Sequence, residues 1–394
     1  MAKPAPHIRI PGSKSISNRL LVLQALYPGL KIRNLSTARD TALLQRALKG
    51  DGDTIDVMDA GTAMRFATGY YAVHTSKPVL ITGTERMKRR PIGPLVEALR
   101  SFGAKIEYAG EEGYPPLRIF PAKLRGGEVS INPGVSSQFI TALMLIAPSL
   151  PEGLCIRFDK NESVSVPYWK MTAELLRQLG ATVKEVADGI CIEALNKPKK
   201  TDFTVESDWS SASYFYAGTA LTGKPVRLSA FQKPSLQGDS ITEKLFEGFG
   251  VRTIWEGDSI LLQKIREPEK DYRQIDCTRF PDLAQTLAVT CFGLQIPCKL
   301  TGLKTLRIKE TDRIAALENE LAKLGATVRS GPDWLEIIPP AEFPVAQPVR
   351  IHTYNDHRMS MAFAALQPLF PNMEILDKDN VRKSFPGFWG SFFF

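Results

Sequence analysis

The sequence predicts a mixed α/β protein of two domains built from six similar units. Its 394 residues exceed the roughly 100–200 that one compact domain usually holds. Two short patterns, a glycine turn and a polar helix start, alternate along the chain with one shared period. One such pattern alone would carry little weight, because many helices end in a glycine. Two interleaved sets with one period instead predict a unit that has been duplicated and triplicated.

The glycine turn is the first of these patterns. It joins a segment with apolar residues at helical spacing to one in which apolar and polar residues alternate, as in LENELAKLGATVR (317–329). Glycine adopts the left-handed conformation that ends a helix without a steric penalty. The sequence therefore predicts left-handed caps between a helix and a strand at Gly103, Gly180, Gly250 and Gly325.

The polar helix start is the second pattern. Its six instances are GSKSISNR (from Gly12), AGTAMR (from Ala60), VSSQF (from Val135), DWSSASY (from Asp208), PDLAQT (from Pro281) and YNDHRM (from Tyr354). Each unit is then expected to run strand, helix, strand, helix, glycine turn and strand. The first interval is shorter than the others, so the first unit is expected to lack a hairpin and its loop.

These helix starts carry more than capping residues. N-capping explains the Ser, Thr, Asn and Asp side chains one at a time. Cations also stand beside them: Lys14 and Arg19 flank the first start, Arg65 follows the second, and His357 and Arg358 lie in the sixth. Because a helix N-terminus exposes unpaired N–H groups and a positive dipole end, we expect these starts to bind phosphate or carboxylate groups.

Three further segments are too polar for ordinary turns: TERMKRRP (84–91), KETDR (309–313) and the region of Lys383. We expect Lys309 and Arg313, four residues apart, to share one helix face with Glu310 beside them. A solvated capping box would also explain KETDR. Cations from such remote segments would together suit one cleft for a highly anionic substrate pair.

Composition excludes several classes of protein. Apolar residues make up 43% and charged residues 23%, which excludes wholesale disorder. The longest apolar stretch, 139–150, is too short to span a bilayer, and the N-terminus shows no secretory pattern. The net charge of +8 suits anionic partners, but it is spread along the chain and favours small ligands over nucleic acid. A generic solubilising surface charge would explain most of it.

Cysteine and histidine usage argues against disulfide and metal chemistry. The number of cysteines is odd and none forms a C-x-x-C pair, so we expect reduced, mostly buried thiols in a cytosolic protein. The four histidines show no metal-ligand spacing, so no zinc site is expected. The cysteines are Cys155, Cys191, Cys277, Cys291 and Cys298.

The chain resembles the 5-enolpyruvylshikimate-3-phosphate (EPSP) synthase family, enolpyruvyl transferases of the shikimate pathway. The matching stretches run in the family's order from end to end. They are PGSKSISNR (11–19), AGTAMR (60–65), RMKRRPIG (86–93), VSSQFITAL (135–143), SASYF (211–215), QGD (237–239), PDLAQT (281–286), KETDR (309–313), YNDHRM (354–359) and K-S-F-P (383–386).

The resemblance implies a fold of two inside-out α/β prism (barrel) domains, each of three βαβαββ units. Residues 1–12 and 207–394 would form one discontinuous domain, and residues 13–206 would form the other. The active site would lie in the cleft between them, which closes on the substrates.

The resemblance also implies a reaction. The enolpyruvyl group of phosphoenolpyruvate would move to the 5-hydroxyl of shikimate 3-phosphate by addition and elimination, with release of phosphate, on the route to chorismate and aromatic amino acids. The family needs no metal or organic cofactor. We expect a cytoplasmic monomer that binds these two small molecules, neither nucleic acid nor membrane, and that is inhibited by glyphosate in competition with phosphoenolpyruvate.

Site residues follow from the family motifs. The implied catalytic residues are Asp282 as proton acceptor, with Glu310 and Lys14 handling protons on the enolpyruvyl carbon. The implied contacts to shikimate 3-phosphate are Lys14, Ser15, Arg19, Ser136, Ser137, Gln138, Ser165, Asp282 and Lys309. The implied contacts to phosphoenolpyruvate are Lys14, Gly61, Arg86, Gln138, Arg313, Arg358 and Lys383.

Three positions depart from the family pattern. Asp59 stands where Asn is usual, Thr305 replaces a common Asn, and Phe66 follows Met-Arg where Pro is usual. An added carboxylate at Asp59 is unexpected near an anion site, unless an arginine screens it. None of these positions is a catalytic candidate, so we expect an active enzyme. The aromatic C-terminus GFWGSFFF (387–394) has no assigned role.

Three rival functions fit the same residues less well. A sister enolpyruvyl transferase that acts on UDP-N-acetylglucosamine would carry a cysteine in the loop GTERMKRRP (83–91), which has none. An RNA-end-processing or RNA-binding protein would need a nucleotide-reactive histidine and stacking aromatic residues beside its cations, and we find neither pattern. A catalytically dead binding protein would not be expected to retain Lys14, Asp282, Glu310 and Lys383.

Overall fold

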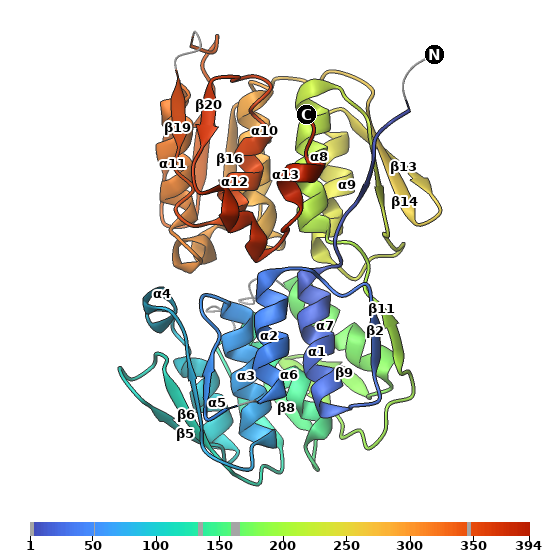
Figure 1. The fold of residues 1–394 in the computed structure, drawn as a ribbon, viewed down its shortest axis with the longest axis vertical. Helices are drawn as coiled ribbons and strands as arrows, with labels where there is room; N and C mark the ends of the chain where they lie inside the picture. Colours follow the sequence, from blue (N-terminus) through green and yellow to red (C-terminus); the bar gives the residue numbers. More distant parts are fainter. Residues whose placement is uncertain (1–3, 51, 133–136, 159–165, 345–347) are drawn as a thin grey trace. The chain divides into compact units, whose positions relative to one another are not determined.

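The computed structural model describes residues 4–50, 52–132, 137–158, 166–344 and 348–394. The chain divides into two compact units, one of Lys14–Val205 and one of Met1–Ser13 with Glu206–Phe394 (Figure 1). We refer to them as the N-terminal unit and the C-terminal unit. The mixed α/β class predicted from the sequence is confirmed in both. No helix in the described part of the chain has the length and apolar character needed to cross a membrane.

The described residues of the N-terminal unit form three sheets. The first has the strand order β3 (Thr54–Asp56), β4 (Val79–Thr82), β6 (Leu117–Phe120) and β5 (Lys105–Tyr108). The second has the order β7 (Gly127–Ser130), β8 (Leu154–Arg157), β10 (Gly189–Ile192) and β9 (Val183–Val186). The third pairs β11 (Asp202–Thr204) in parallel with β2 (Lys31–Arg33). In each four-stranded sheet a parallel pair is extended by an antiparallel hairpin.

The C-terminal unit repeats this plan. Its sheets have the orders β1 (His7–Arg9), β12 (Val226–Ser229), β14 (Ser259–Lys264), β13 (Val251–Glu256), and β15 (Arg273–Asp276), β16 (Cys298–Thr301), β18 (Leu335–Ile338), β17 (Thr327–Ser330). A third, two-stranded sheet pairs β19 (Val349–Ile351) with β20 (Met373–Ile375) in parallel. Strand β1, at the start of the chain, pairs with β12, which explains why residues 1–13 belong to this unit.

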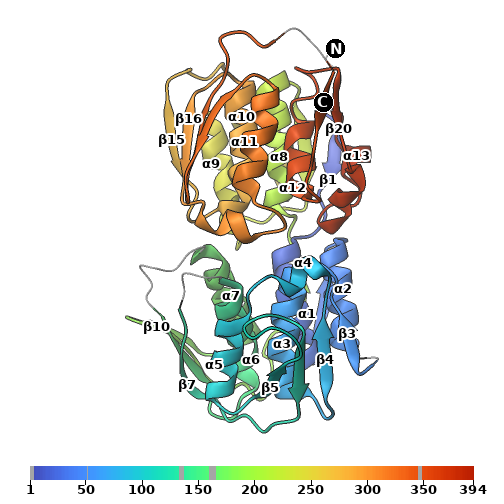
Figure 2. The ribbon, with the colours of Figure 1, turned by 90° about the vertical axis from the view of Figure 1, so that its left-hand side faces the viewer.

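Helices occupy the middle of each unit and the sheets lie around them, as Figures 1 and 2 show. The N-terminal unit holds α1 (Lys14–Leu26), α2 (Arg39–Lys49), α3 (Gly61–His74), α4 (Glu85–Lys88), α5 (Gly93–Ser101), α6 (Ser137–Ile146) and α7 (Val166–Leu179). The C-terminal unit holds α8 (Trp209–Thr222), α9 (Thr242–Glu247), α10 (Ala284–Gly293), α11 (Arg313–Lys323), α12 (His357–Ala364) and α13 (Phe388–Ser391). Helices α3 and α8 are buried nearly all round, as expected of helices enclosed by sheets.

The predicted glycine turns are confirmed. Gly103, Gly180, Gly250 and Gly325 have φ values of +107°, +106°, +81° and +95°, and each lies between a helix and a strand. The first unit is short, as expected: α2 is followed directly by β3. The same plan is wrong for the sixth unit, where β20 is followed by the 3-10 helix η5 (Lys378–Lys383) and α13, with no hairpin among the described residues.

The aromatic C-terminus completes that sixth unit. Phe388 is fully buried, and its ring stacks on that of Phe392 with the ring centroids 4.8 Å apart. The ring of Phe394 lies against Gly218 of α8, where an added Cβ would come within 2.4 Å of it. The tail therefore covers α8 in place of a hairpin, which gives a packing role to a segment that had none in the sequence.

Two of the five cysteines overturn the expectation of reduced thiols. Cys155 on β8 and Cys191 on β10 lie directly opposite each other in the antiparallel register and form a disulfide. The sequence could not show this pairing, because it depends on the register of two strands that are distant along the chain. Cys277, Cys291 and Cys298 are buried free thiols, as expected.

Candidate active site

Arg313 is the centre of an ionic cluster of three carboxylates in the C-terminal unit. It is the first residue of α11, and only 1% of the residue is exposed. Its Nε lies 2.7 Å from Asp356 Oδ2, its Nη2 2.8 Å from Glu310 Oε2, and its Nη1 3.3 Å from Asp282 Oδ1. Burial lowers the pKa of this guanidinium, but the three carboxylates outweigh it and raise the pKa overall.

Asp282 joins Arg313 to a second arginine. Arg358 Nη2 lies 2.8 Å from Asp282 Oδ2, and its Nη1 donates to the backbone oxygen of Asp282 at 3.2 Å. Asp282 lies in the 3-10 helix η3 (Pro281–Leu283), just before α10, and its side chain caps neither helix. Its carboxylate is therefore held between two guanidinium groups, and N-capping does not explain its presence.

The KETDR segment differs from the expectation in one respect. Lys309 ends the 3-10 helix η4 (Lys304–Ile308) in an extended conformation, whereas α11 begins only at Arg313. Helix α11 starts there because the Asp312 carboxylate accepts hydrogen bonds from the backbone N–H groups of Ile314 and Ala315, both at 3.1 Å. Lys309 and Arg313 therefore do not share a helix face, and the interpretation of KETDR as helical throughout is wrong.

A further acidic residue, Asp239, is buried in the same unit. It lies in the 3-10 helix η2 (Gly238–Ile241) and accepts a hydrogen bond from the Ser210 hydroxyl near the start of α8. Burial, followed by the nearby charge of Asp282, raises the pKa of Asp239 to about 7. The sequence pointed to this residue only as part of the QGD motif.

Lys14 opens helix α1 in the N-terminal unit and pairs with a carboxylate that the sequence did not single out. Its Nζ lies 3.2 Å from Asp40 Oδ2, and the Asp40 side chain is 4% exposed. Asp40 stands near the start of α2, where a negative charge is favoured by the helix dipole. Ser15, next to Lys14 on α1, accepts a hydrogen bond from Arg19 through its backbone oxygen.

Arg19 is enclosed among helices α1, α6 and α7. Its guanidinium donates four hydrogen bonds, to Thr172 Oγ1 at 2.8 Å, Ser15 O at 2.8 Å, Tyr168 O at 3.0 Å and Thr141 Oγ1 at 3.3 Å. Burial lowers the pKa of Arg19 to about 10. Its contact with shikimate 3-phosphate stays a prediction, because these bonds give it a clear structural role.

The starts of α3 and α6 lie side by side. Gln138 of α6 donates from Nε2 to Thr62 Oγ1 of α3 at 3.4 Å. Gly61 is the first residue of α3, and a Cβ added there would lie 2.5 Å from Nη1 of Arg90. In the sequence, Arg90 was distinguished only as part of the polar segment TERMKRRP (84–91). Ser137 begins α6, whereas the predicted contacts Ser136 and Ser165 lie outside the described residues.

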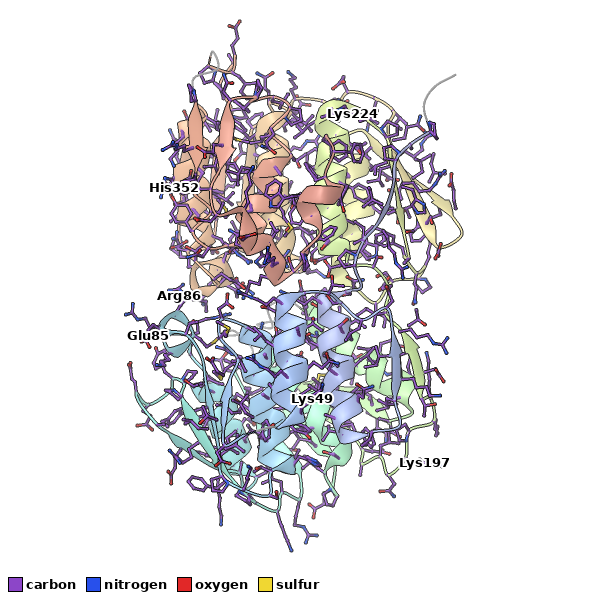
Figure 3. The ribbon with its side chains drawn as sticks, viewed as in Figure 1. Lys49, Glu85, Arg86, Lys197, Lys224 and His352 are labelled. Carbon is purple, nitrogen blue, oxygen red and sulfur yellow. A yellow bond between two sulfur atoms is a disulfide. The ribbon has the colours of Figure 1, made fainter. Side chains whose placement is uncertain are left out.

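The remaining predicted residues have contrasting surroundings. Arg86 is exposed on the short helix α4, and Figure 3 shows it with Glu85 at the edge of the N-terminal unit. Lys383 is 2% exposed at the end of η5. The departure at Asp59 is screened, because its Oδ1 lies 2.6 Å from Nη2 of Arg39. Among the described residues, no group of three or more His, Cys, Asp or Glu side chains could hold a metal ion.

The structure thus gathers two separate sets of predicted residues. Asp282, Glu310, Arg313 and Arg358 contact one another within the C-terminal unit. Lys14, Arg19, Gly61 and Gln138 lie at or near helix starts of the N-terminal unit. We predict that the two sets act on the same substrates, and this stays a prediction.

The chain matches one family model over most of its length. The model, described as EPSP synthase (3-phosphoshikimate 1-carboxyvinyltransferase), covers residues 44–392. This chain belongs to the EPSP synthase family. The family inferred from the motifs is thereby confirmed, and the residues gathered around Asp282 belong to an enolpyruvyl transferase rather than to an RNA-binding protein.

Individual EPSP synthase relatives match nearly the whole chain. The chain is 42% identical to the 3-phosphoshikimate 1-carboxyvinyltransferase of Bacteroides fragilis strain YCH46, over 97% of this chain and 93% of that protein. It is 36% identical to the protein of the same name from Serratia proteamaculans strain 568, over 97% and 94%. The solved EPSP synthase of Acinetobacter baumannii has the same fold, with a TM-score of 0.72, 23% identity, and coverage of 98% of this chain and 94% of that one.

Proposed function

We propose that this chain transfers the enolpyruvyl group of phosphoenolpyruvate to the 5-hydroxyl of shikimate 3-phosphate and releases phosphate. The single observation that carries the proposal is the membership of the EPSP synthase family along nearly the whole chain. In the addition step the hydroxyl oxygen bonds to C2 while C3 gains a proton. In the elimination step the bond from C2 to the phosphate oxygen breaks and C3 loses a proton.

Asp282 is the proposed proton acceptor for the 5-hydroxyl. Its salt bridges to Arg358 at 2.8 Å and Arg313 at 3.3 Å favour the carboxylate form, which a base needs. The same contacts fix the orientation of the carboxylate, so little reorganisation is needed when the substrate binds.

Arg313 and Arg358 are the proposed ligands of phosphoenolpyruvate in this unit, together with Lys383. A guanidinium binds carboxylate and phosphate groups through two parallel hydrogen bonds. In the structure the Nη2 of Arg313 is paired with Glu310 at 2.8 Å. An incoming anion would compete for that nitrogen and free the Glu310 carboxylate, which is the proposed proton carrier at C3.

The N-terminal unit is proposed to supply the other contacts. Lys14 would meet both substrates and assist proton transfer, and Gln138 would contact both. Ser15, Arg19, Ser136, Ser137 and Ser165 would bind shikimate 3-phosphate together with Lys309 and Asp282. Gly61 and Arg86 would bind phosphoenolpyruvate. The proposal requires the domains of residues 1–12 with 207–394 and of residues 13–206 to close on the substrates, as the family's cleft implies.

We further propose a cytoplasmic monomer that acts on these two small molecules, without a cofactor and without nucleic acid or membrane as partners. The family name, which is that of a biosynthetic enzyme, supports this location. The disulfide between Cys155 and Cys191 is unusual for a reducing compartment, so the state of these two thiols in the cell is a direct check on it.

Phosphate release tests the proposed function. The purified protein is incubated with phosphoenolpyruvate, with and without shikimate 3-phosphate, in excess chelator, and phosphate and organic product are measured together. We expect phosphate only when both substrates are present, in equal amount to the enolpyruvyl product. Phosphate release without shikimate 3-phosphate would contradict the reaction. Loss of activity in chelator that a divalent ion restores would contradict metal independence.

A further inference from the structure

The turn between β19 and α12 has an unusual backbone. Tyr354 and Asn355 both adopt left-handed conformations, with φ values of +53° and +55°. Non-glycine residues seldom adopt this conformation, and a bulky residue such as tyrosine does so only where its surroundings hold it. The chain runs directly from these two residues into Asp356, His357 and Arg358. The contacts that stabilise the turn therefore also determine the positions of these three residues.

Glu320 of α11 contacts the first left-handed residue, Tyr354, and His352 two residues before it. Its side chain is completely buried. Oε1 accepts a hydrogen bond from the Tyr354 hydroxyl at 2.7 Å, and Oε2 accepts from the backbone N–H of His352 at 3.0 Å. Oε2 also lies 2.6 Å from Lys323 Nζ, which balances the charge of the buried carboxylate.

Apolar burial does not explain the position of Tyr354. The residue is 37% exposed, so its ring gains only part of the free energy available from full burial. Partial burial and the hydrogen bond to Glu320 raise the pKa of its hydroxyl, as expected for a phenol that donates to a carboxylate. The hydroxyl is therefore the group through which α11 contacts this residue.

Helix α11 holds the turn at a second point. Arg313, seven residues before Glu320 and thus on the same helix face, pairs with Asp356 at 2.7 Å. Asp356 in turn accepts a hydrogen bond from the backbone N–H of Arg358 at 2.9 Å and so begins α12. One helix thus contacts the turn at His352 and Tyr354 through Glu320, and at Asp356 through Arg313.

We propose that Glu320 is a positioning residue that, through the Tyr354 hydroxyl, holds the 352–356 turn in the conformation that aims Arg358 at phosphoenolpyruvate. The inference rests on the proposed function, since it takes Arg358 as a ligand of that substrate. It assigns a role to two residues that touch neither substrate in the proposed mechanism. Figure 3 labels His352, the first residue of this turn, in the C-terminal unit.

The test removes one hydroxyl group and compares two tyrosines. Tyr354→Phe deletes the bond to Glu320 and keeps the ring. Tyr272→Phe is the matched control, because the Tyr272 hydroxyl donates to Glu336 at the same 2.7 Å, in the same unit but in a pair that does not include the 352–356 turn. We expect Tyr354→Phe to raise the KM for phosphoenolpyruvate about 5–20-fold, because a small displacement of a binding group is costly. The KM for shikimate 3-phosphate should change less than about twofold.

A second variant addresses the carboxylate itself. In Glu320→Gln the amide oxygen can still accept the hydrogen bond from the Tyr354 hydroxyl, but the amide NH2 group cannot accept one from the backbone N–H of His352. We therefore expect a rise in the KM for phosphoenolpyruvate that is smaller than that of Tyr354→Phe. The double variant loses both contacts, so it should raise this KM at least as much as the more affected single variant. Tyr272→Phe should leave both KM values unchanged.

The outcomes separate this inference from the proposed function. If the wild-type chain forms no enolpyruvyl product, the proposed function fails and this inference fails with it. If the wild-type chain is active and folded Tyr354→Phe keeps its KM for phosphoenolpyruvate, the positioning role is overturned and the function stands. A Tyr354→Phe variant that loses melting temperature, with both KM values unaltered, would show that the contact is only structural.

Discussion

Arg19 in the N-terminal unit and Arg313 in the C-terminal unit are both buried, but their surroundings are opposite. The hydrogen bonds of Arg19 go to two hydroxyls and two backbone oxygens, and burial lowers its pKa to about 10. Arg313 is surrounded by Asp282, Glu310 and Asp356, which raise its pKa. Neutral acceptors leave the charge of Arg19 largely uncompensated, whereas carboxylates compensate that of Arg313.

Arg65 extends this difference. It is buried at the start of α3, bonded to the backbone oxygens of Gly61 and Pro91, and burial followed by the charge of Arg90 lowers its pKa. The N-terminal unit therefore concentrates positive charge near helix starts, which attracts anions over a distance. In the C-terminal unit, Arg313 and Arg358 instead form ion pairs with Asp282, which suits a base.

The largest expected effect concerns that base. Asp282→Asn keeps the size and hydrogen-bonding capacity of the side chain but removes its ability to take a proton. If Asp282 accepts the proton of the 5-hydroxyl, turnover should fall by roughly 10²–10⁴-fold, while binding of shikimate 3-phosphate weakens much less.

Asp208→Asn is the matched control for this variant. Asp208 caps α8 by accepting from the backbone N–H of Ser211 at 2.8 Å, and asparagine caps a helix about as well. Its turnover should stay near that of the wild type. Near-normal turnover in folded Asp282→Asn would remove Asp282 from the mechanism.

The second prediction compares the two arginines directly. Arg313→Met leaves three carboxylates without their common partner, and removing one member of a buried ion pair costs about 3–5 kcal/mol of folding stability. Arg19→Met leaves only neutral groups unpaired, which costs about 1–3 kcal/mol. Urea unfolding of both variants near neutral pH measures the difference. Equal losses would show that the ionic partners do not distinguish the two sites.

Local patterns made part of this site predictable. The glycine turns and polar helix starts depend on a few neighbouring residues, so Gly103, Gly325 and the starts of α3 and α12 appear where the sequence placed them. The family motifs named Asp282 and Arg358 without the structure. How the motif residues pair was beyond local reasoning, because Arg313 meets Asp356 across 43 positions of the chain.

Contacts between remote segments account for what was missed. Asp40 became visible only through its ion pair with Lys14, and Cys155 with Cys191 only through the strand register. The helical assignment of Lys309 failed for a different reason. Asp312 caps α11 and stops the helix from extending back, a competition that i,i+4 spacing alone does not reveal.

The third prediction uses Asp239 and pH. The pKa of Asp239 is raised to about 7 in the folded protein, mainly by burial, against an ordinary value of 3.8. Between those pH values the folded state holds a proton that the unfolded state has released, so this group's contribution to stability is lost as pH rises. Asp239→Asn can still accept from Ser210 and does not titrate.

The melting temperature of Asp239→Asn, measured relative to the wild type, should therefore rise as the pH increases from about 4 to about 7 and level off above that. Asp258→Asn serves as the control, because Asp258 is an exposed aspartate of the same unit. The melting temperature of Asp258→Asn relative to the wild type should not show this rise with pH. A difference for Asp239→Asn that is constant with pH would contradict a protonated Asp239 at neutrality.

The smallest expected effect concerns Gly61 and inhibition by glyphosate. A Cβ at this position would come within 2.5 Å of Nη1 of Arg90, so Gly61→Ala must displace that guanidinium. Because the Arg90 guanidinium is the end of a flexible side chain, the displacement should cost little stability. It should weaken competitive inhibition by glyphosate about 10-fold, as expected for one added methyl group in a binding site, while the KM for shikimate 3-phosphate changes less.

Gly29→Ala is the control, because a Cβ there meets nothing within 4 Å. If the effect passes through Arg90, Gly61→Ala combined with Arg90→Met should be no more resistant than Arg90→Met alone. Unaltered inhibition of an active Gly61→Ala variant would show that this helix start does not contact the inhibitor.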